Sequence, residues 1–75
     1  MKAKLIFDLP EEQTEFKFAT QGSDWWNVCW NMDQWLRGNT KHAPDSMSDD
    51  EYKTYELCRE KLRQLIDESG LNLDQ

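Results

Sequence analysis

Four tryptophans within eleven residues are the side chains of this 75-residue sequence best suited to binding. Trp26 and Trp30 lie one helical turn apart, on the side of a predicted helix that also carries Asp33 and Arg37. Exposed tryptophan beside arginine is typical of the residues that dominate binding energy in protein interfaces. We therefore predict that Trp26, Trp30, Asp33 and Arg37 form a partner-binding surface, either for another protein or for a second copy of the chain.

Two alternative functions remain: one uses the same tryptophans to bind a nucleotide, and the other uses acidic residues. Tryptophan faces stack on bases, so a small nucleotide-binding protein remains an alternative, although only Arg37 and Lys41 supply nearby positive charge. An acidic surface can also imitate the phosphates of DNA, whose charges follow one another at about 1.7 Å along the helix axis. An acidic DNA-mimic inhibitor of a nucleic-acid enzyme is the main alternative, ahead of the nucleotide-binding protein, and its candidate residues are Asp49, Asp50, Glu56 and Glu60.

The sequence offers little for catalysis or metal binding. Glu56 and Glu60 could form a carboxylate pair, but acid–base chemistry needs one of them buried, and no apolar residues surround them in the predicted helix. His42 lies alone in a polar loop, and Cys29 and Cys58 have no ligating partner at metal-site spacing. We predict no enzyme activity, no cofactor and no metal. Both cysteines are expected to be reduced, with a bridge between them left open.

Composition narrows the class of protein. The net charge of −6 argues against direct binding of nucleic acid or of an anionic membrane. No apolar run approaches the roughly 18 residues of a membrane span, and the first eight residues do not match a secretory signal. We expect one small domain over residues 1–75 in the cytoplasm.

The elements that must position these residues begin with an alternating segment. Residues 2–8 alternate apolar and polar side chains, which predicts a strand. Its partner is expected to be residues 71–73, or a second copy across a dimer. Residues 10–21 follow a capping Asp8 and have Pro10 in the first turn, which favours a helix. A hairpin with residues 2–8 is the alternative.

A second helix is predicted from the N-cap Ser23 to a stop at Gly38. Six of its apolar residues fall within an arc of roughly 120°. We expect this arc to face the core; its members are Trp25, Val28, Cys29, Met32, Trp35 and Leu36. Residues 38–47 are predicted to form a loop.

The last helix has the clearest boundaries. Ser48 and Glu51 form a capping box, and Met47 and Tyr52 flank it as a hydrophobic staple. Gly70 marks the end, with Leu71 expected to contact Ile66. Its predicted buried face contains Tyr55, Cys58, Leu62, Leu65, Ile66 and Ser69. The whole is predicted to be a mostly helical α+β domain with an N-terminal strand, three helices and a short C-terminal strand.

The order of these segments resembles a group of small acidic proteins of tailed bacteriophages and prophages. The resemblance spans nearly the whole chain, and its most distinctive stretch is 32–37, Met-Asp-Gln-Trp-Leu-Arg. It implies a setting in the bacterial cytoplasm during infection and no catalytic mechanism. We expect a non-catalytic phage accessory protein that binds and modulates a host or phage protein.

Overall fold

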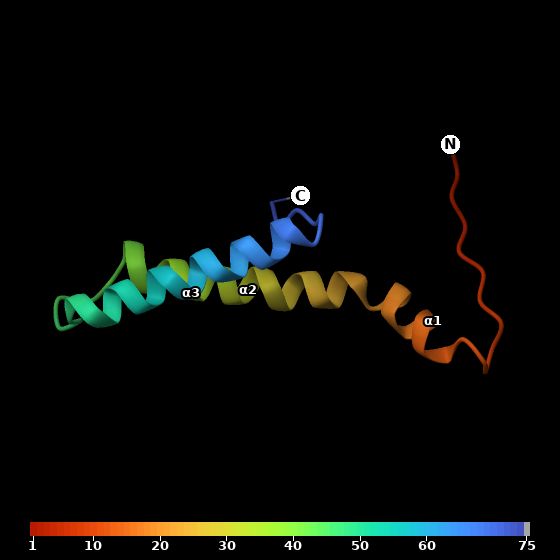
Figure 1. The fold of residues 1–75 in the computed structure, drawn as a ribbon, viewed down its shortest axis with the longest axis horizontal. Coiled ribbons are helices and arrows are strands. Elements are labelled where there is room, and N and C mark those ends of the chain that lie inside the picture. Colours follow the sequence, from red (N-terminus) through yellow and green to blue (C-terminus); the bar gives the residue numbers. More distant parts are fainter. Residues whose placement is uncertain (75) are drawn as a thin grey trace.

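The computed structural model describes residues 1–74, which form three helices (Figure 1). The helices are α1 (Gln13–Thr20), α2 (Gly22–Lys41) and α3 (Asp49–Glu68). The two long helices lie side by side and antiparallel and are joined by a short loop. The short helix α1 lies beyond the other end of α2, before its first residue (Figure 1). The packed part of the molecule is therefore a helical hairpin.

The predicted strands are absent, so the α+β assignment is wrong and residues 1–74 are helical without a sheet. Residues 2–8 extend away from the helices as an arm (Figure 1). Residues 71–73, the expected strand partner, instead turn back onto α2, where the carbonyl oxygen of Leu73 accepts a hydrogen bond from Trp26 Nε1 at 3.1 Å. Because a strand needs a paired neighbour, binding of this tail to α2 leaves the arm without one.

A helix within residues 10–21 is confirmed, although it is shorter than predicted. It begins at Gln13, after a turn in which the Asp8 amide donates to the Glu12 carboxylate at 2.9 Å. Phe16 of α1 holds the base of the arm through an edge-on contact with Phe7, with ring centroids 5.7 Å apart. Gly22 does not stop this helix: only Gln21 separates α1 from α2, and Gly22 is the first residue of α2.

Helix α2 continues through the predicted stop at Gly38 and ends at Lys41. A glycine inside a helix costs only about 1 kcal/mol relative to alanine, so it does not by itself end one. Local bonds support the extra turn, since the side-chain amide of Asn39 donates to the Trp35 carbonyl and the Thr40 hydroxyl donates to the Arg37 carbonyl. The prediction that the loop begins at residue 38 is therefore wrong by four residues.

Both predicted ends of α3 are confirmed. The Ser48 hydroxyl accepts a hydrogen bond from the Glu51 amide at 3.2 Å, which makes Ser48 the N-cap. At the other end Gly70 has φ +74°, a conformation that glycine adopts without strain. The Gly70 amide donates to Asp67 and the Leu71 amide to Ile66, the pattern of a Schellman motif.

The chain is extended and has little interior. Its radius of gyration is 17.4 Å, against about 11 Å for a compact domain of this length. Its accessible surface is 6521 Å², about a third more than the scaling for compact monomers gives. Among residues 1–74 only Asp33, Leu36 and Leu73 are buried. One copy of this chain therefore lacks the core that usually stabilises a domain.

Candidate protein interface

The centre of the contact between α2 and α3 is a buried charge. The Asp33 side chain is 0% exposed and lies between two arginines one turn apart on α3. Arg59 Nε donates to Asp33 Oδ1 at 3.0 Å, and Arg63 bonds both carboxylate oxygens, at 2.9 Å from Nε and 2.8 Å from Nη2. The Arg63 hydrogen bonds are the main reason that the pKa of Asp33 falls to about 2. Asp33 is thus a charged structural anchor between the two helices.

The same cluster extends to the C-terminal tail. Arg63 Nη1 donates to Asp74 Oδ2 at 2.9 Å, while Trp26 Nε1 holds the Leu73 carbonyl. Asp33, with help from Asp74, raises the pKa of Arg63 above its ordinary value. Residues from both helices therefore hold the tail across α2, and this contact buries Leu73.

The predicted core face of α2 is wrong for four of its six residues. Leu36 is buried and Cys29 is half-buried, but Trp25, Val28, Met32 and Trp35 are exposed. The side of α2 that packs on α3 is turned by roughly one residue step, about 100°, from the apolar arc. This rotation follows from Asp33, because its contact with Arg59 and Arg63 brings that edge of the helix inward.

On α3 the predicted buried face is also partly wrong. Tyr55, Leu62 and Ile66 are half-buried against α2, whereas Cys58, Leu65 and Ser69 are exposed. The half-buried positions include Arg59 and Arg63, which the apolar pattern omitted.

Four of the exposed apolar residues of α2 form one row, which we call the aromatic stripe and define as Trp25, Val28, Met32 and Trp35. Their spacing of three, four and three residues places them on one side of the helix and is the spacing of a coiled-coil seam. Trp25 is 59% exposed and Trp35 56% exposed. Trp35 also contacts Tyr55 of α3 edge-on, with ring centroids 5.5 Å apart. The stripe therefore lies beside α3 and is not covered by it.

A cavity of about 320 Å³ opens beside the first residue of the stripe. Trp25 and Cys29 of α2 line it, together with Ile66 of α3 and Leu71 of the tail. Apolar concavities of this kind are where binding surfaces take up an anchoring side chain.

The structure separates the four residues of the predicted partner surface. Trp26 and Trp30 do stack on each other, with centroids 5.5 Å apart and planes 10° apart. Arg37 is exposed, Trp30 is half-buried and Asp33 is fully enclosed by α3. Asp33 is therefore not available to a partner, and contact through Trp26, Trp30 and Arg37 stays a prediction.

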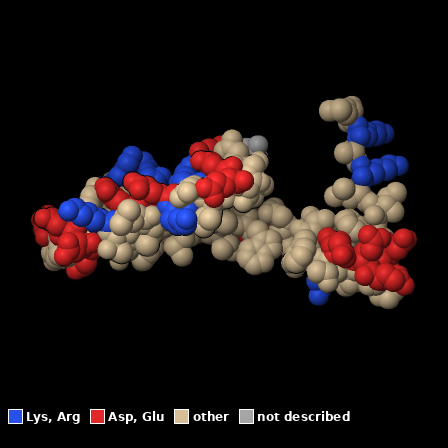
Figure 2. Space-filling view, in the orientation of Figure 1, with Lys and Arg blue, Asp and Glu red and all other residues tan. Residues whose placement is uncertain are grey.

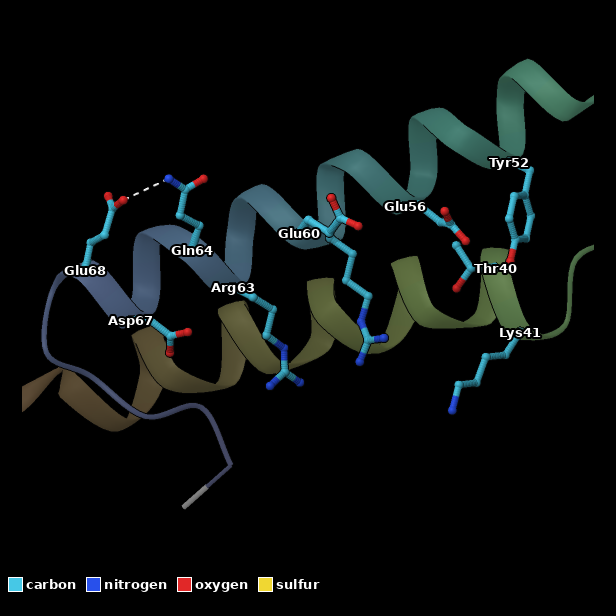
Figure 3. Close-up of a pocket in the computed structure, with 10 residues that line it drawn as sticks. Thr40, Lys41, Tyr52, Glu56, Glu60, Arg63, Gln64, Asp67 and Glu68 are labelled. Carbon is cyan, nitrogen blue, oxygen red and sulfur yellow. Dashed lines mark hydrogen bonds between the residues drawn. The ribbon is translucent and has the colours of Figure 1, made fainter.

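The acidic residues of the DNA-mimic alternative do not form an unbroken row. Asp49 and Asp50 lie in the first turn of α3, whereas Glu56 and Glu60 line a polar groove between α2 and α3 (Figure 3). Arg59 and Arg63 line the same groove. The nearby Glu56 carboxylate raises the pKa of Tyr52 there. Figure 2 shows acidic atoms gathered at both ends of the molecule, with basic atoms between the acids along α3.

Other residue types are scattered. Cys29 and Cys58 are free thiols, and His42 is the C-cap of α2. Within residues 1–74, no three potential metal-ligating side chains come together. None of the three helices is long and apolar enough to span a membrane.

Sequence reasoning missed the arginines of the anchor and the exposure of the stripe. Two arginines four residues apart within the apolar period of the last helix were the available signal. Comparison with known proteins adds no further assignment, since no protein-family model, curated protein or solved structure matches the chain. The site therefore rests on its own geometry.

Proposed function

We propose that this chain is a non-catalytic binding protein that contacts another protein through the aromatic stripe. The observation that carries the proposal is a row of large apolar side chains at seam spacing on a helix whose other side is already packed. Proteins that bind a partner through such a row bury it against a helix of the partner or in an apolar groove of the partner. Exposed tryptophan is also among the residues that contribute most per position to protein binding.

The surroundings of the charged groups support a binding role over a catalytic one. Asp33, the carboxyl group with the strongly lowered pKa, is enclosed by Arg59 and Arg63 and holds two helices together. A catalytic acid or base must reach its substrate, which an enclosed carboxylate cannot do. Action in the bacterial cytoplasm on a host or phage protein belongs to this proposal and follows from the resemblance.

We favour the aromatic stripe over the side of α2 that carries Trp26 and Arg37, because side chains on that side already make contacts within the chain. Trp26 donates to the tail and stacks on Trp30, and Asp33 is used inside the hairpin. The stripe residues keep half or more of their surface free. Burial of such side chains contributes about 25 cal/mol per Å² of apolar area.

A photoreactive amino acid placed at Met32 tests the proposal directly. The matched control carries it at Asn27, which is exposed on the same helix outside the stripe. Irradiation of cells that produce the chain should give a discrete protein adduct from position 32 and not from position 27. Absence of an adduct specific to position 32 would contradict a role for the stripe in protein binding.

A further inference from the structure

The exposed apolar surface continues from α2 onto α3. Leu65 is 51% exposed and Cys58 is exposed. Helical periodicity places both on the side of α3 next to the stripe. Trp35 meets Tyr55 at one end of this region, and Trp25 shares a cavity with Ile66 at the other. One broad side of the hairpin therefore presents the stripe of α2 and, beside it, the exposed Cys58 and Leu65 of α3.

The unburied area matches what a dimer needs. The surface of the chain, 6521 Å², exceeds that of a compact monomer of this mass by roughly 1,700 Å², part of which is the extended arm. A stable interface buries about 800 Å² on each partner. Contiguous apolar patches on monomers rarely exceed a few hundred Å². The surplus, arm included, exceeds the area that one partner buries in a stable interface.

We infer that the occupant of this face is a second copy of the chain, packed as an antiparallel pair so that two hairpins form a four-helix bundle. This inference rests on the proposed function and names its partner. The stripe is self-complementary under a two-fold axis, because reversing it pairs Trp25 with Trp35 and Val28 with Met32 of the copy. Each layer then contains residues of matched size.

Topology favours the antiparallel arrangement. A two-fold axis perpendicular to the helices sets α3 beside α3 of the copy, so Leu65 is covered as well as the stripe. A parallel pair would bring only the two α2 helices together. The antiparallel pair also opposes the helix dipoles.

The borders of the stripe do not oppose self-association. Asn31 and Asn39 lie next to it on α2, and the nearest buried charge, Asp33, is neutralised by arginines. Acidic atoms gather at both ends of the molecule (Figure 2). The stripe itself contains no charged residue, so two copies can approach along it.

Sedimentation equilibrium on the full chain tests the inference. Wild type should have the mass of a dimer, Met32→Glu should be a helical monomer, and Asn27→Glu, which adds the same charge outside the stripe, should stay a dimer. If Met32→Glu does not fold, the wild-type mass decides alone. A wild-type chain that stays monomeric at the highest attainable concentration overturns the inference.

Disulfide formation tests the orientation in a Cys29→Ala, Cys58→Ala background. The antiparallel pair predicts that a mixture of Val28→Cys and Met32→Cys chains cross-links more than either chain alone. Efficient cross-linking of each chain alone overturns the antiparallel arrangement. A monomer by sedimentation that still gives a position-32 adduct with a different protein overturns the second copy as occupant and leaves the proposed function standing. A chain that is monomeric by sedimentation and gives no position-32 adduct contradicts both the inference and the proposed function.

Discussion

The two sides of α2 differ in a way that reverses the usual distribution of residues. Its side toward α3 encloses a carboxylate, Asp33, held by Arg59 and Arg63. Its opposite side exposes the aromatic stripe to solvent. A buried ion pair adds little net stability compared with an apolar contact, but removing one partner is costly. The comparison indicates that the inner side specifies how the hairpin pairs, while the outer side leaves apolar area uncovered.

The largest expected effect follows from removing the inner charge. Asp33→Asn leaves two arginine side chains facing a neutral amide in the helix contact. We expect it to lower the free energy of unfolding by about 3–5 kcal/mol, as measured by urea denaturation. Asp24→Asn, the same change at an exposed position of α2, should have an effect below about 0.5 kcal/mol. Equal effects at the two positions would contradict the anchor.

Acid should weaken the inner side next. The pKa of Asp33 is lowered from 3.8 to about 2 in the folded chain. Its contribution is therefore fully present above about pH 4 and is lost as the pH falls toward 2. The shift corresponds to about 2 kcal/mol. Unfolding measured across this range should show the loss in wild type and not in Asp33→Asn, and parallel curves would contradict the assignment.

The tail contact is expected to contribute less. Trp26→Phe removes the donor to the Leu73 carbonyl but keeps a stacking ring against Trp30. We expect a loss of about 1 kcal/mol, with faster amide exchange over residues 71–74. Trp35→Phe is the matched control on the aromatic stripe, because the phenylalanine ring can still contact Tyr55. Unchanged exchange in the Trp26→Phe tail would show that this bond does not hold the tail.

The smallest effect should come from the outer end of the charge cluster. Asp74 is 64% exposed and bonds Arg63 on the surface. Exposed ion pairs contribute about 0–1 kcal/mol. Asp74→Asn should lower the unfolding free energy by less than 1 kcal/mol in dilute salt and leave it unchanged in concentrated salt. A loss as large as that of Asp33→Asn would mean that the tail, and not the helix contact, is the anchor.

Local signals in the sequence predicted the helix ends where a single side chain or glycine makes the cap. Ser48 and Gly70 are examples, because their bonds involve only nearby residues. The predicted strand at residues 2–8 does not form, because strand pairing depends on residues far apart in the sequence. Its expected partner, residues 71–73, is bonded to Trp26 instead. Gly38 failed as a stop because neighbouring Asn39 and Thr40 support another turn.

The candidate site could be predicted only in its composition. The tryptophan-rich helix was predicted, but which of its faces stays exposed was not. Apolar periodicity assigned Trp25 and Trp35 to the core, since the pattern does not reveal whether an apolar row meets its own chain or another one. Asp33 was assigned to the surface because its two arginine partners lie 26 and 30 residues away.

The concentration dependence of unfolding tests most directly whether the outer side of α2 is completed by a partner copy. Urea denaturation of the wild-type chain is measured at two chain concentrations about tenfold apart. A dimer should gain about 1.4 kcal/mol of apparent stability for each tenfold rise, by mass action. The account predicts this shift in wild type and its absence in Met32→Glu. A wild-type midpoint that does not move with concentration would contradict it.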